Sequence, residues 1–441
     1  MKKPEPPPGV PSSYNYGEVL QKLSEKNKFQ EFVDISQNKY LYWDKWKYLA
    51  KDWNIDPKLL WAAVKSSRLH AVRLYFNTLP NLSISSNAIV QELLHTCDMN
   101  LGGYIQGESI VPSEEKDRYL MSSLMEEAIA SSQLEGADTS RKFAKEMLAN
   151  NIKPKNISEQ MIVNNYEAMQ WIAKNKQLPI TPENICALHA IITKNTLTRQ
   201  TEEGVFRSDN DVVVRSTQTG EILHQPPPFE ELEKIMNEYC AYCNDEKKES
   251  YFIHPVSKGI IAHFLLGYIH PFADGNGRTA RVIFYWFLLK KGYWLIEYMS
   301  VSRIILQSKA KYARAYLYTE LDALDVTYFI MYNLECILRA LEELKSHIKR
   351  KTAEKRNLLN LLKNSHWNNR QISILQEILK DPLQSYTVQA IQTWFGVSNQ
   401  TARTDLNELV KDGLLLERSR GRKYLYFPVS DAHEKIQKWI S

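Results

Sequence analysis

Residues 270–281, HPFADGNGRTAR, bring one histidine, one aspartate, a Gly-Asn-Gly turn and two arginines within a dozen positions. A histidine titrates near neutrality, so His270 is suited to accept a proton from an attacking hydroxyl group. Asp274 supplies a carboxylate four residues later. Backbone amides of a glycine-rich turn and arginine side chains both bind anions, so the stretch predicts a site at which a phosphorylated substrate reacts.

The flanking segments set this polar stretch at the start of a helix. Residues 260–269 are rich in apolar side chains, residues 282–289 are almost wholly apolar, and Lys290-Lys291-Gly292 is typical of a helix end. The N–H groups at a helix N-terminus attract anions, and Gly275 and Gly277 let the backbone approach one closely. The sequence therefore predicts an anion site where the second helix begins.

Two arginines and one acid complete the expected site. Arg278 and Arg281 are three residues apart, so they share one helical face and can clamp further phosphate oxygens. Asp274 would repel a phosphate unless Mg²⁺, bound by the carboxylate and the phosphates together, lies between them. This set predicts phosphoryl or nucleotidyl transfer, and no GxxxxGK[ST] loop offers another phosphate site. The alternative interpretation is a capped helix with a surface histidine and solvated arginines.

The whole stretch resembles the core motif of Fic-domain proteins, HxFx(D/E)GNGRxxR, and matches it at every fixed position. The resemblance covers roughly residues 113–345. It implies a Mg²⁺-dependent nucleotidyltransferase that moves AMP from ATP to a Ser, Thr or Tyr hydroxyl of a target protein and releases pyrophosphate. In the family a lysine at the first glycine position goes with a phosphotransferase that binds the nucleotide reversed, so Gly275 favours AMP transfer.

The resemblance also implies roles for individual residues of the loop. His270 would deprotonate the target hydroxyl, and Asp274 would hold Mg²⁺. Asn276, together with the amides of Gly275 and Gly277, would cradle the α-phosphate of ATP.

Arg278 and Arg281 would then bind the outer phosphates of ATP, and Arg281 has a competitor for that role. The segment SSQLEG, from Ser131 to Gly136, resembles the inhibitory motif (S/T)xxxE(G/N) of one class of the family. A carboxylate–guanidinium pair is short and directional, so Glu135 would pair with Arg281 and occupy the space of the γ-phosphate. The alternatives are a solvated glutamate at a helix end and a family activity in which this acid positions water to remove AMP.

A β-hairpin is expected over residues 212–224, VVVRSTQTGEILH. It stands where the family has a flap that holds a target segment by strand addition, which makes Val213, Val214 and Arg215 the expected docking residues. The alternative is a plain surface hairpin. Just before it, the segment GVFR at 204–207 resembles another recurrent stretch of the family.

A separate C-terminal pattern resembles a winged helix-turn-helix. Two short helical patterns meet at Gly396-Val397-Ser398, and strand-like segments follow. The second helix offers a polar face that can reach base edges, and a basic tip between the strands can neutralise phosphates. The polar face is Asn399, Gln400, Arg403, Thr404 and Asn407, and the tip is Arg418, Arg420, Arg422 and Lys423. The alternative to DNA binding is a protein-docking or dimerisation module.

The length of the chain and the spacing of its apolar residues indicate its domains and fold class. The 441 residues predict two or three domains, and apolar residues mostly recur at helical spacing. The expected fold is mainly α, with a Fic helical bundle, a small β-hairpin flap and a C-terminal winged-helix domain. The expected parts are an N-terminal helical region 1–112, a Fic domain 113–345 with its inhibitory helix at about 114–136, a helical linker 346–369 and a winged helix-turn-helix 370–441.

Composition limits the partners and the compartment. A net charge of +5 is too small to indicate nucleic acid by itself, and Cys240 and Cys243 form a CxxC without a second pair, which favours reduced thiols over zinc. The start, MKKPEPPPGVPSSY, lacks an apolar signal core and no run spans a membrane, so a cytoplasmic protein is expected.

Three alternatives stay open at this point. The chain could be a DNA-binding regulator with a nucleotide-sensing Fic site or a de-AMPylase, and it could form a homodimer.

Overall fold

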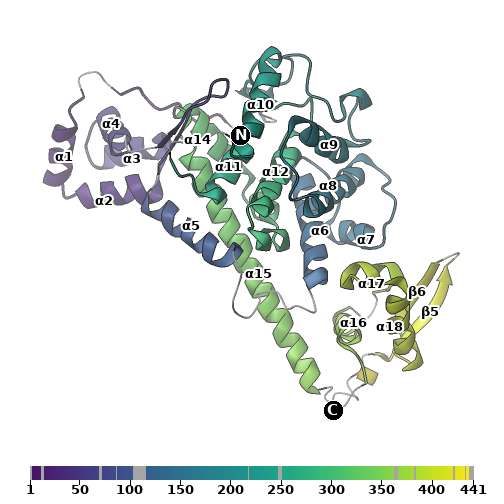
Figure 1. Cartoon of the computed structure of the whole chain (residues 1–441). Helices are drawn as coiled ribbons and strands as arrows, with labels where there is room; N and C mark the ends of the chain where they lie inside the picture. Colours follow the sequence, from purple (N-terminus) through teal and green to yellow (C-terminus); the bar gives the residue numbers. More distant parts are fainter. Residues whose placement is uncertain are drawn as a thin grey trace. The chain divides into compact units, whose positions relative to one another are not determined.

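The structure is a computed structural model that describes residues 2–10, 14–68, 72–85, 87–102, 116–216, 218–246, 251–361, 366–381, 384–420, 423–432 and 434–436. Over these residues the chain is mainly helical, with three two-stranded antiparallel sheets (Figure 1). It divides into two compact units. The first comprises Met1–Gly103, Glu167–Ile296 and Val301–Arg339, and the second comprises Tyr104–Tyr166, Glu297–Ser300 and Ala340–Ser441.

The N-terminal part of the first unit is helical, as the sequence predicts, and also holds a small hairpin that the sequence does not reveal. The helices are α1 (Tyr16–Glu25), α2 (Phe29–Asp34) with the π-turn Ile35–Lys39, α3 (Trp43–Asp52), α4 (Pro57–Ser67) and α5 (Ala88–Leu101). The hairpin pairs β1 (Val72–Leu74) with β2 (Leu82–Ile84). Three-residue strands are too short for alternation to show. The backbone of Ser83 also pairs with Leu324 and Val326, which are remote in sequence.

Aromatic side chains join these helices to the rest of the first unit. Tyr42 stacks on Tyr318 with ring centroids 4.0 Å apart, and the guanidinium of Arg68 lies 3.6 Å from the ring centre of Tyr40. Arg68 also donates to the hydroxyl of Tyr328 at 2.7 Å. The aromatic residues of this region thus pack into the core, and Tyr75 is an exception that is exposed.

Two buried helices form the centre of the first unit, α11 (Pro255–Ile269) and α12 (Asn276–Lys290). They lie side by side, with α9 (Pro182–Thr193) and α10 (Leu232–Cys243) against them (Figure 1). Gly259 permits the close approach of α11 to α12, because a Cβ there would lie 3.0 Å from the ring of Phe287. Helix α12 ends as predicted, with Gly292 at a φ of +88° just beyond Lys290.

Shorter elements complete the first unit around this pair. The hairpin expected at 212–224 is present. Its two antiparallel strands, β3 (Val214–Arg215) and β4 (Ile222–His224), are shorter than the expected range. The remaining elements are α13 (Val301–Leu306), α14 (Lys309–Leu321), the start of α15 (Thr327–Leu361), the end of α8 (Ile157–Lys174), the 3₁₀ turns Gln200–Glu202 and Phe229–Glu231, and the start of the 3₁₀ turn Trp294–Tyr298.

Helix α6 (Lys116–Leu134) and α7 (Arg141–Ala149) open the described part of the second unit. The start of the helix expected from about 114 lies outside the described residues, and its end agrees with the prediction. Gly136 has a φ of +95°, and the amide of Ala137 donates back to the carbonyl of Ser132 at 3.0 Å, which closes the helix. Ser123 also fixes α6, donating to the carbonyl of Tyr298 at 2.6 Å.

The C-terminal part of the second unit is a winged helix-turn-helix, as predicted. Its elements are α16 (Asn369–Lys380), α17 (Val388–Phe395), α18 (Asn399–Lys411) and the antiparallel strands β5 (Leu415–Arg420) and β6 (Lys423–Pro428). Gly396 turns the chain between α17 and α18 with a φ of +63°. Leu406, Leu409 and Tyr426 are among the fully buried residues of its core. Arg422, part of the expected basic tip, lies outside the described residues.

Candidate active site

The polar stretch identified in the sequence forms the turn between α11 and α12. His270 ends α11 in the left-handed backbone region, with a φ of +48°, which a non-glycine residue adopts only where its surroundings hold it. Its Nδ1 lies 3.1 Å from the carbonyl oxygen of Gly267. A carbonyl only accepts, so Nδ1 carries the proton, and the basic lone pair of the neutral ring is on Nε2. Nε2 is therefore the atom that can accept a proton from a substrate.

The side chain of Asn276 closes the turn. Its Oδ1 accepts from the amide of Phe272 at 2.9 Å, and its Nδ2 donates to the carbonyl of the same residue at 2.8 Å. Asn276 is 2% exposed and Phe272 is fully buried. Asn276 thus gives the loop its shape, and its expected contact with an α-phosphate stays a prediction.

Asp274 and Gly275 form the tip of the turn. Asp274 is exposed, and its Oδ1 accepts from the amide of Gly275. Gly275 caps α12 with a φ of +82°, and a Cβ there would lie only 2.7 Å from the methyl group of Thr193. Both the backbone angle and the lack of space therefore require glycine at this position.

His189, in α9, contacts this turn from the protein interior and was not singled out from the sequence. Its ring is fully buried and stacks on Phe272, with centroids 3.6 Å apart and planes 2° from parallel. Nδ1 accepts from the amide of Gly204 at 3.0 Å, and Nε2 lies 2.8 Å from the carbonyl oxygen of Asp274. Burial lowers the pKa of His189 to about 4, so the ring is neutral at physiological pH.

Arg207, from the segment GVFR, connects the turn to the hairpin. Its amide donates to the carbonyl of Pro271 at 2.9 Å, and its Nε donates to the carbonyl of His270 at 3.0 Å. The same guanidinium donates to the carbonyls of Asp209 and Pro227, on either side of the hairpin. One buried side chain therefore holds both the backbone of His270 and the segments that flank the hairpin.

The two expected phosphate clamps are buried at the start of α12. Arg278 is 1% exposed and donates from Nη1 to the carbonyl of Ile192 at 3.1 Å. Arg281 is 2% exposed, and its positive charge helps burial to lower the pKa of His263 to about 3. Both guanidinium groups lie within the protein interior, which disagrees with the alternative of solvated arginines, and their expected contact with phosphates stays a prediction.

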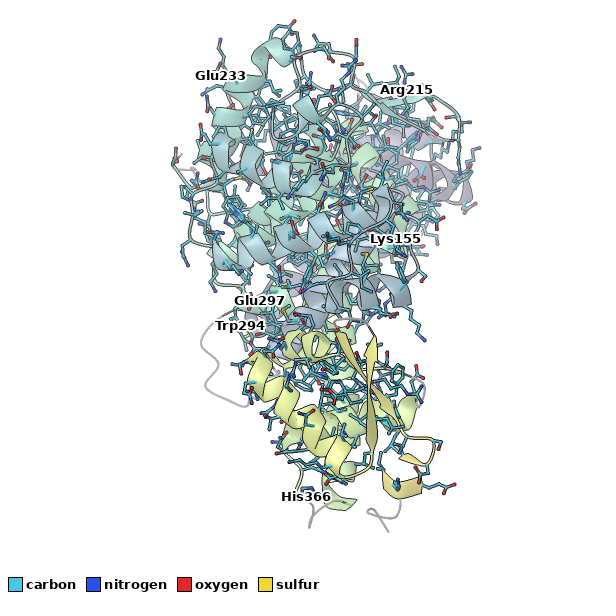
Figure 2. The ribbon with its side chains drawn as sticks, turned by 90° about the vertical axis from the view of Figure 1, so that its right-hand side faces the viewer. Lys155, Arg215, Glu233, Trp294, Glu297 and His366 are labelled. Carbon is cyan, nitrogen blue, oxygen red and sulfur yellow. The ribbon has the colours of Figure 1, made fainter. Side chains whose placement is uncertain are left out.

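The hairpin presents an exposed edge residue and is anchored at its far end. Arg215, labelled in Figure 2, is exposed on β3, while Val213 and Val214 are partly buried. The ring of His224, on β4, lies 2.8 Å from a carboxylate oxygen of Glu320 and 2.7 Å from the carbonyl of Tyr268. The hairpin is thereby tied to α14 and α11.

The inhibitory segment expected in the sequence ends α6. Ser131 is buried within the helix, and Glu135 and Gly136 follow its last residue, Leu134. The amide of Glu135 donates to the carbonyl of Ser132 at 3.1 Å. The role of this segment as a brake stays a prediction.

The donor set at the turn suits one kind of metal ion. Across the parts of the chain that the structure describes, no three His, Cys, Asp or Glu side chains gather as a metal site would need. An exposed single carboxylate, Asp274, beside a helix N-terminus fits Mg²⁺ held together with substrate phosphates. Cys240 and Cys243 are buried thiols of α10, and burial raises the pKa of Cys243 to about 12.

Comparison with known proteins agrees with this geometry. Residues 179–288 match the Fic/DOC family, and this segment contains the whole turn. The chain contains a Fic domain. Residues 370–425 match the DeoR-like helix-turn-helix domain, which lies apart from the Fic domain in the sequence. Among the described residues, no helix is both long and apolar enough to cross a membrane.

Curated relatives resemble the Fic domain over part of their length. A protein adenylyltransferase Fic of Nematostella vectensis is 42% identical over 79 residues, which is 18% of each chain. One of Drosophila virilis is 34% identical over 128 residues, 29% of this chain and 24% of the relative. The chain thus spans about a fifth of the length of these relatives. A solved structure of Fic-1 (aa134 - 508) from C. elegans covers 76% of this chain and 88% of its own, at 15% identity and a TM-score of 0.50, and shares the fold.

Proposed function

We propose that this chain is a Mg²⁺-dependent protein adenylyltransferase, which transfers AMP from ATP to a Ser, Thr or Tyr hydroxyl of a target protein. The observation that carries the proposal is His270, with its basic Nε2, immediately before an anion-binding helix start. The relatives named protein adenylyltransferase Fic support the choice of an adenylyl group.

The chemistry follows from the positions of these groups. Nε2 of His270 accepts the proton of the target hydroxyl as the oxygen forms a bond to the α-phosphorus of ATP. The bond from that phosphorus to the bridging oxygen breaks, and pyrophosphate leaves with the electron pair. The amides of Gly275 and Gly277 at the start of α12 receive the α-phosphate oxygens, and Arg278 and Arg281 serve the outer phosphates. Mg²⁺ held by Asp274 would neutralise the phosphate charge.

His270→Ala tests this proposal. With α-³²P-ATP and a cell lysate, the substitution should abolish label transfer to protein, since general-base catalysis contributes about 10²–10⁴-fold. Thermal denaturation of the variant serves as the folding control. Label transfer that persists at the wild-type rate would remove His270 as the base.

Glu135 is proposed as the brake on this reaction, and it competes with the γ-phosphate for Arg281. The position of Glu135 directly after α6 and the resemblance of SSQLEG to the inhibitory motif support this role. Glu135→Gly should raise label transfer strongly, and unchanged transfer would mean that the brake lies elsewhere. The same reaction mixture, supplied with an AMP-modified protein, reports any release of AMP and so tests the de-AMPylase alternative.

The hairpin is proposed to hold the target segment by strand addition along β3, next to Arg215. Short strands paired with each other leave backbone groups on their outer edges for another strand. Such pairing aligns a hydroxyl while reading little sequence, which suits transfer to a hydroxyl group that Ser, Thr and Tyr share.

A second candidate function is DNA-dependent regulation through the winged helix-turn-helix. The observation that favours it is the exposed polar face of α18, on which Gln400, Arg403, Thr404 and Asn407 all reach solvent. Side chains of such a face read base edges in the major groove. Salt-dependent binding of duplex DNA without any label transfer would favour this function over AMP transfer.

A further inference from the structure

His189, on α9, binds the tip of the catalytic turn through its ring. Its two ring nitrogens have opposite partners, the amide of Gly204 at Nδ1 and the carbonyl of Asp274 at Nε2. The amide can only donate and the carbonyl can only accept, so the proton of the neutral ring is on Nε2. The tautomer is therefore fixed by the backbone on both sides.

This contact sets the orientation of one peptide plane. In a trans peptide the C=O and the N–H point in opposite directions. The carbonyl of Asp274 points inward to His189, so the amide of Gly275 points outward, where it donates to the exposed carboxylate of Asp274. A flip of this peptide would present a carbonyl oxygen to the phosphates and bury an N–H against the imidazole.

Packing holds the ring itself in place. Phe272 stacks flat on one side of His189, and a Cβ at Gly275 would lie 3.1 Å from Nε2. The ring is fully buried, and the hydroxyl of Thr193 donates to the backbone carbonyl of His189 at 2.7 Å. A ring with so little freedom can act as a fixed support for the turn.

We propose that His189 is a positioning residue that locks the Asp274–Gly275 peptide with its N–H outward, in the form that receives the phosphates of the nucleotide. This inference rests on the proposed function, because it supposes that a nucleotide binds at the start of α12. It predicts that His189 governs nucleotide affinity, while His270, which is held separately by Arg207, keeps its chemistry.

Two amide substitutions separate the two hydrogen bonds of His189. In His189→Gln the terminal amide can stand at the position of Nε2 and donate to Asp274. In His189→Asn the amide oxygen can stand at the position of Nδ1 and accept from Gly204, but nothing reaches Asp274. The two variants remove similar amounts of the ring, so loss of packing affects both and serves as the internal control.

The test is calorimetric binding of ADP to the full chain with Mg²⁺, followed by the KM and kcat for ATP in label transfer. We expect His189→Asn to weaken ADP binding and raise the KM for ATP at least tenfold, with a smaller change in kcat, and His189→Gln to stay within about threefold of wild type. Equal losses in the two folded variants, or a loss confined to kcat, would overturn the proposal.

Failure of the proposed function has a different signature. If Glu135→Gly, in which the proposed brake is removed, binds ADP but transfers no AMP, the adenylyltransferase assignment fails, while the contrast between the Asn and Gln variants in ADP binding still decides the role of His189. If the wild type binds no nucleotide, both proposals are overturned.

Discussion

Helices α12 and α18 begin with similar residues and use them in opposite ways. Helix α12 starts NGRTAR, and α18 starts NQTART. In α12 the pair Arg278-Thr279 is buried, whereas in α18 the pair Arg403-Thr404 is exposed. The same side-chain types are therefore enclosed in one helix and form an open polar face in the other.

The difference lies in the bonding partners. At α12 the polar side chains bind backbone groups of the turn and of α9, as Asn276 does with Phe272 and Arg278 with Ile192. At α18 two of them bind side chains of neighbouring elements, since Asn399 donates to Gln392 of α17 and Asn407 accepts from the hydroxyl of Tyr426 on β6. Catalysis requires groups that are fixed before the substrate arrives, and a binding face can order its side chains on contact. Substitutions at the start of α12 should therefore cause larger losses of activity than the losses of binding caused by substitutions on the exposed face of α18.

The largest effect is expected at Gly275. In Gly275→Ala a methyl group would meet Thr193 and His189 and displace the turn. Displacements of about 1 Å in an active site cost roughly 10²-fold in rate, so label transfer should fall about 100-fold. The kcat/KM for ATP measures this loss.

Gly292→Ala is the matched control for that substitution. Gly292 lies at the other end of α12 with a φ of +88°, close to the +82° of Gly275, and a methyl group there would meet no atom within 4 Å. Both substitutions carry the same backbone strain, of order 1–3 kcal/mol, and only Gly275→Ala adds the clash. Equal activity of the two variants would show that the turn tolerates displacement.

A smaller effect, on the pH dependence of stability, is expected from His263, the buried histidine of α11. His263 is enclosed next to Arg281, and burial with that charge lowers its pKa from 6.5 to about 3. The unfolded chain then binds the proton more tightly, so stability falls as the pH drops below about 6.5. Between pH 7 and pH 5 the wild type should lose about 2 kcal/mol more than His263→Gln, which does not titrate.

Urea denaturation of both proteins at each pH measures this difference. The hydrogen bond to Tyr312 is 2.8 Å long, and the glutamine amide can replace it, which makes the pH slope rather than the absolute stability the relevant comparison. Identical slopes would mean that folding does not change the pKa of His263, which would contradict the expected effect of its burial.

The smallest effect is expected at the exposed face of α18. Arg403→Ala should lower the affinity for duplex DNA by about 1 kcal/mol, roughly fivefold, and leave label transfer unchanged. Fluorescence anisotropy at two salt concentrations measures the affinity and its electrostatic part. A parallel loss of label transfer would show that the recognition face and the catalytic turn do not act separately.

Sequence reasoning reached the turn, the hairpin, the helix ends and the winged helix, because each has a local pattern of glycines, prolines or periodic apolar residues. It did not reach the two backbone contacts of His189, since a single histidine in an apolar helix has no local signal. The partners of His189 are 15 and 85 residues away in the chain. Nor could it show that Asn276 binds its own loop, because the residue type suits a phosphate equally well. The β1–β2 hairpin was missed because its strands span three residues each.

Arg207 binds both the backbone of His270 and the chain on either side of the hairpin. One planar guanidinium binds the carbonyls of His270, Asp209 and Pro227, so the backbone of His270 and the segments on either side of the hairpin are held to the same side chain. If a target strand pairs with the hairpin, only a hydroxyl group that extends the right distance from its own backbone can reach the imidazole of His270. The choice between the short hydroxyl side chains of Ser and Thr and the long one of Tyr would then depend on side-chain length and not on the neighbouring sequence.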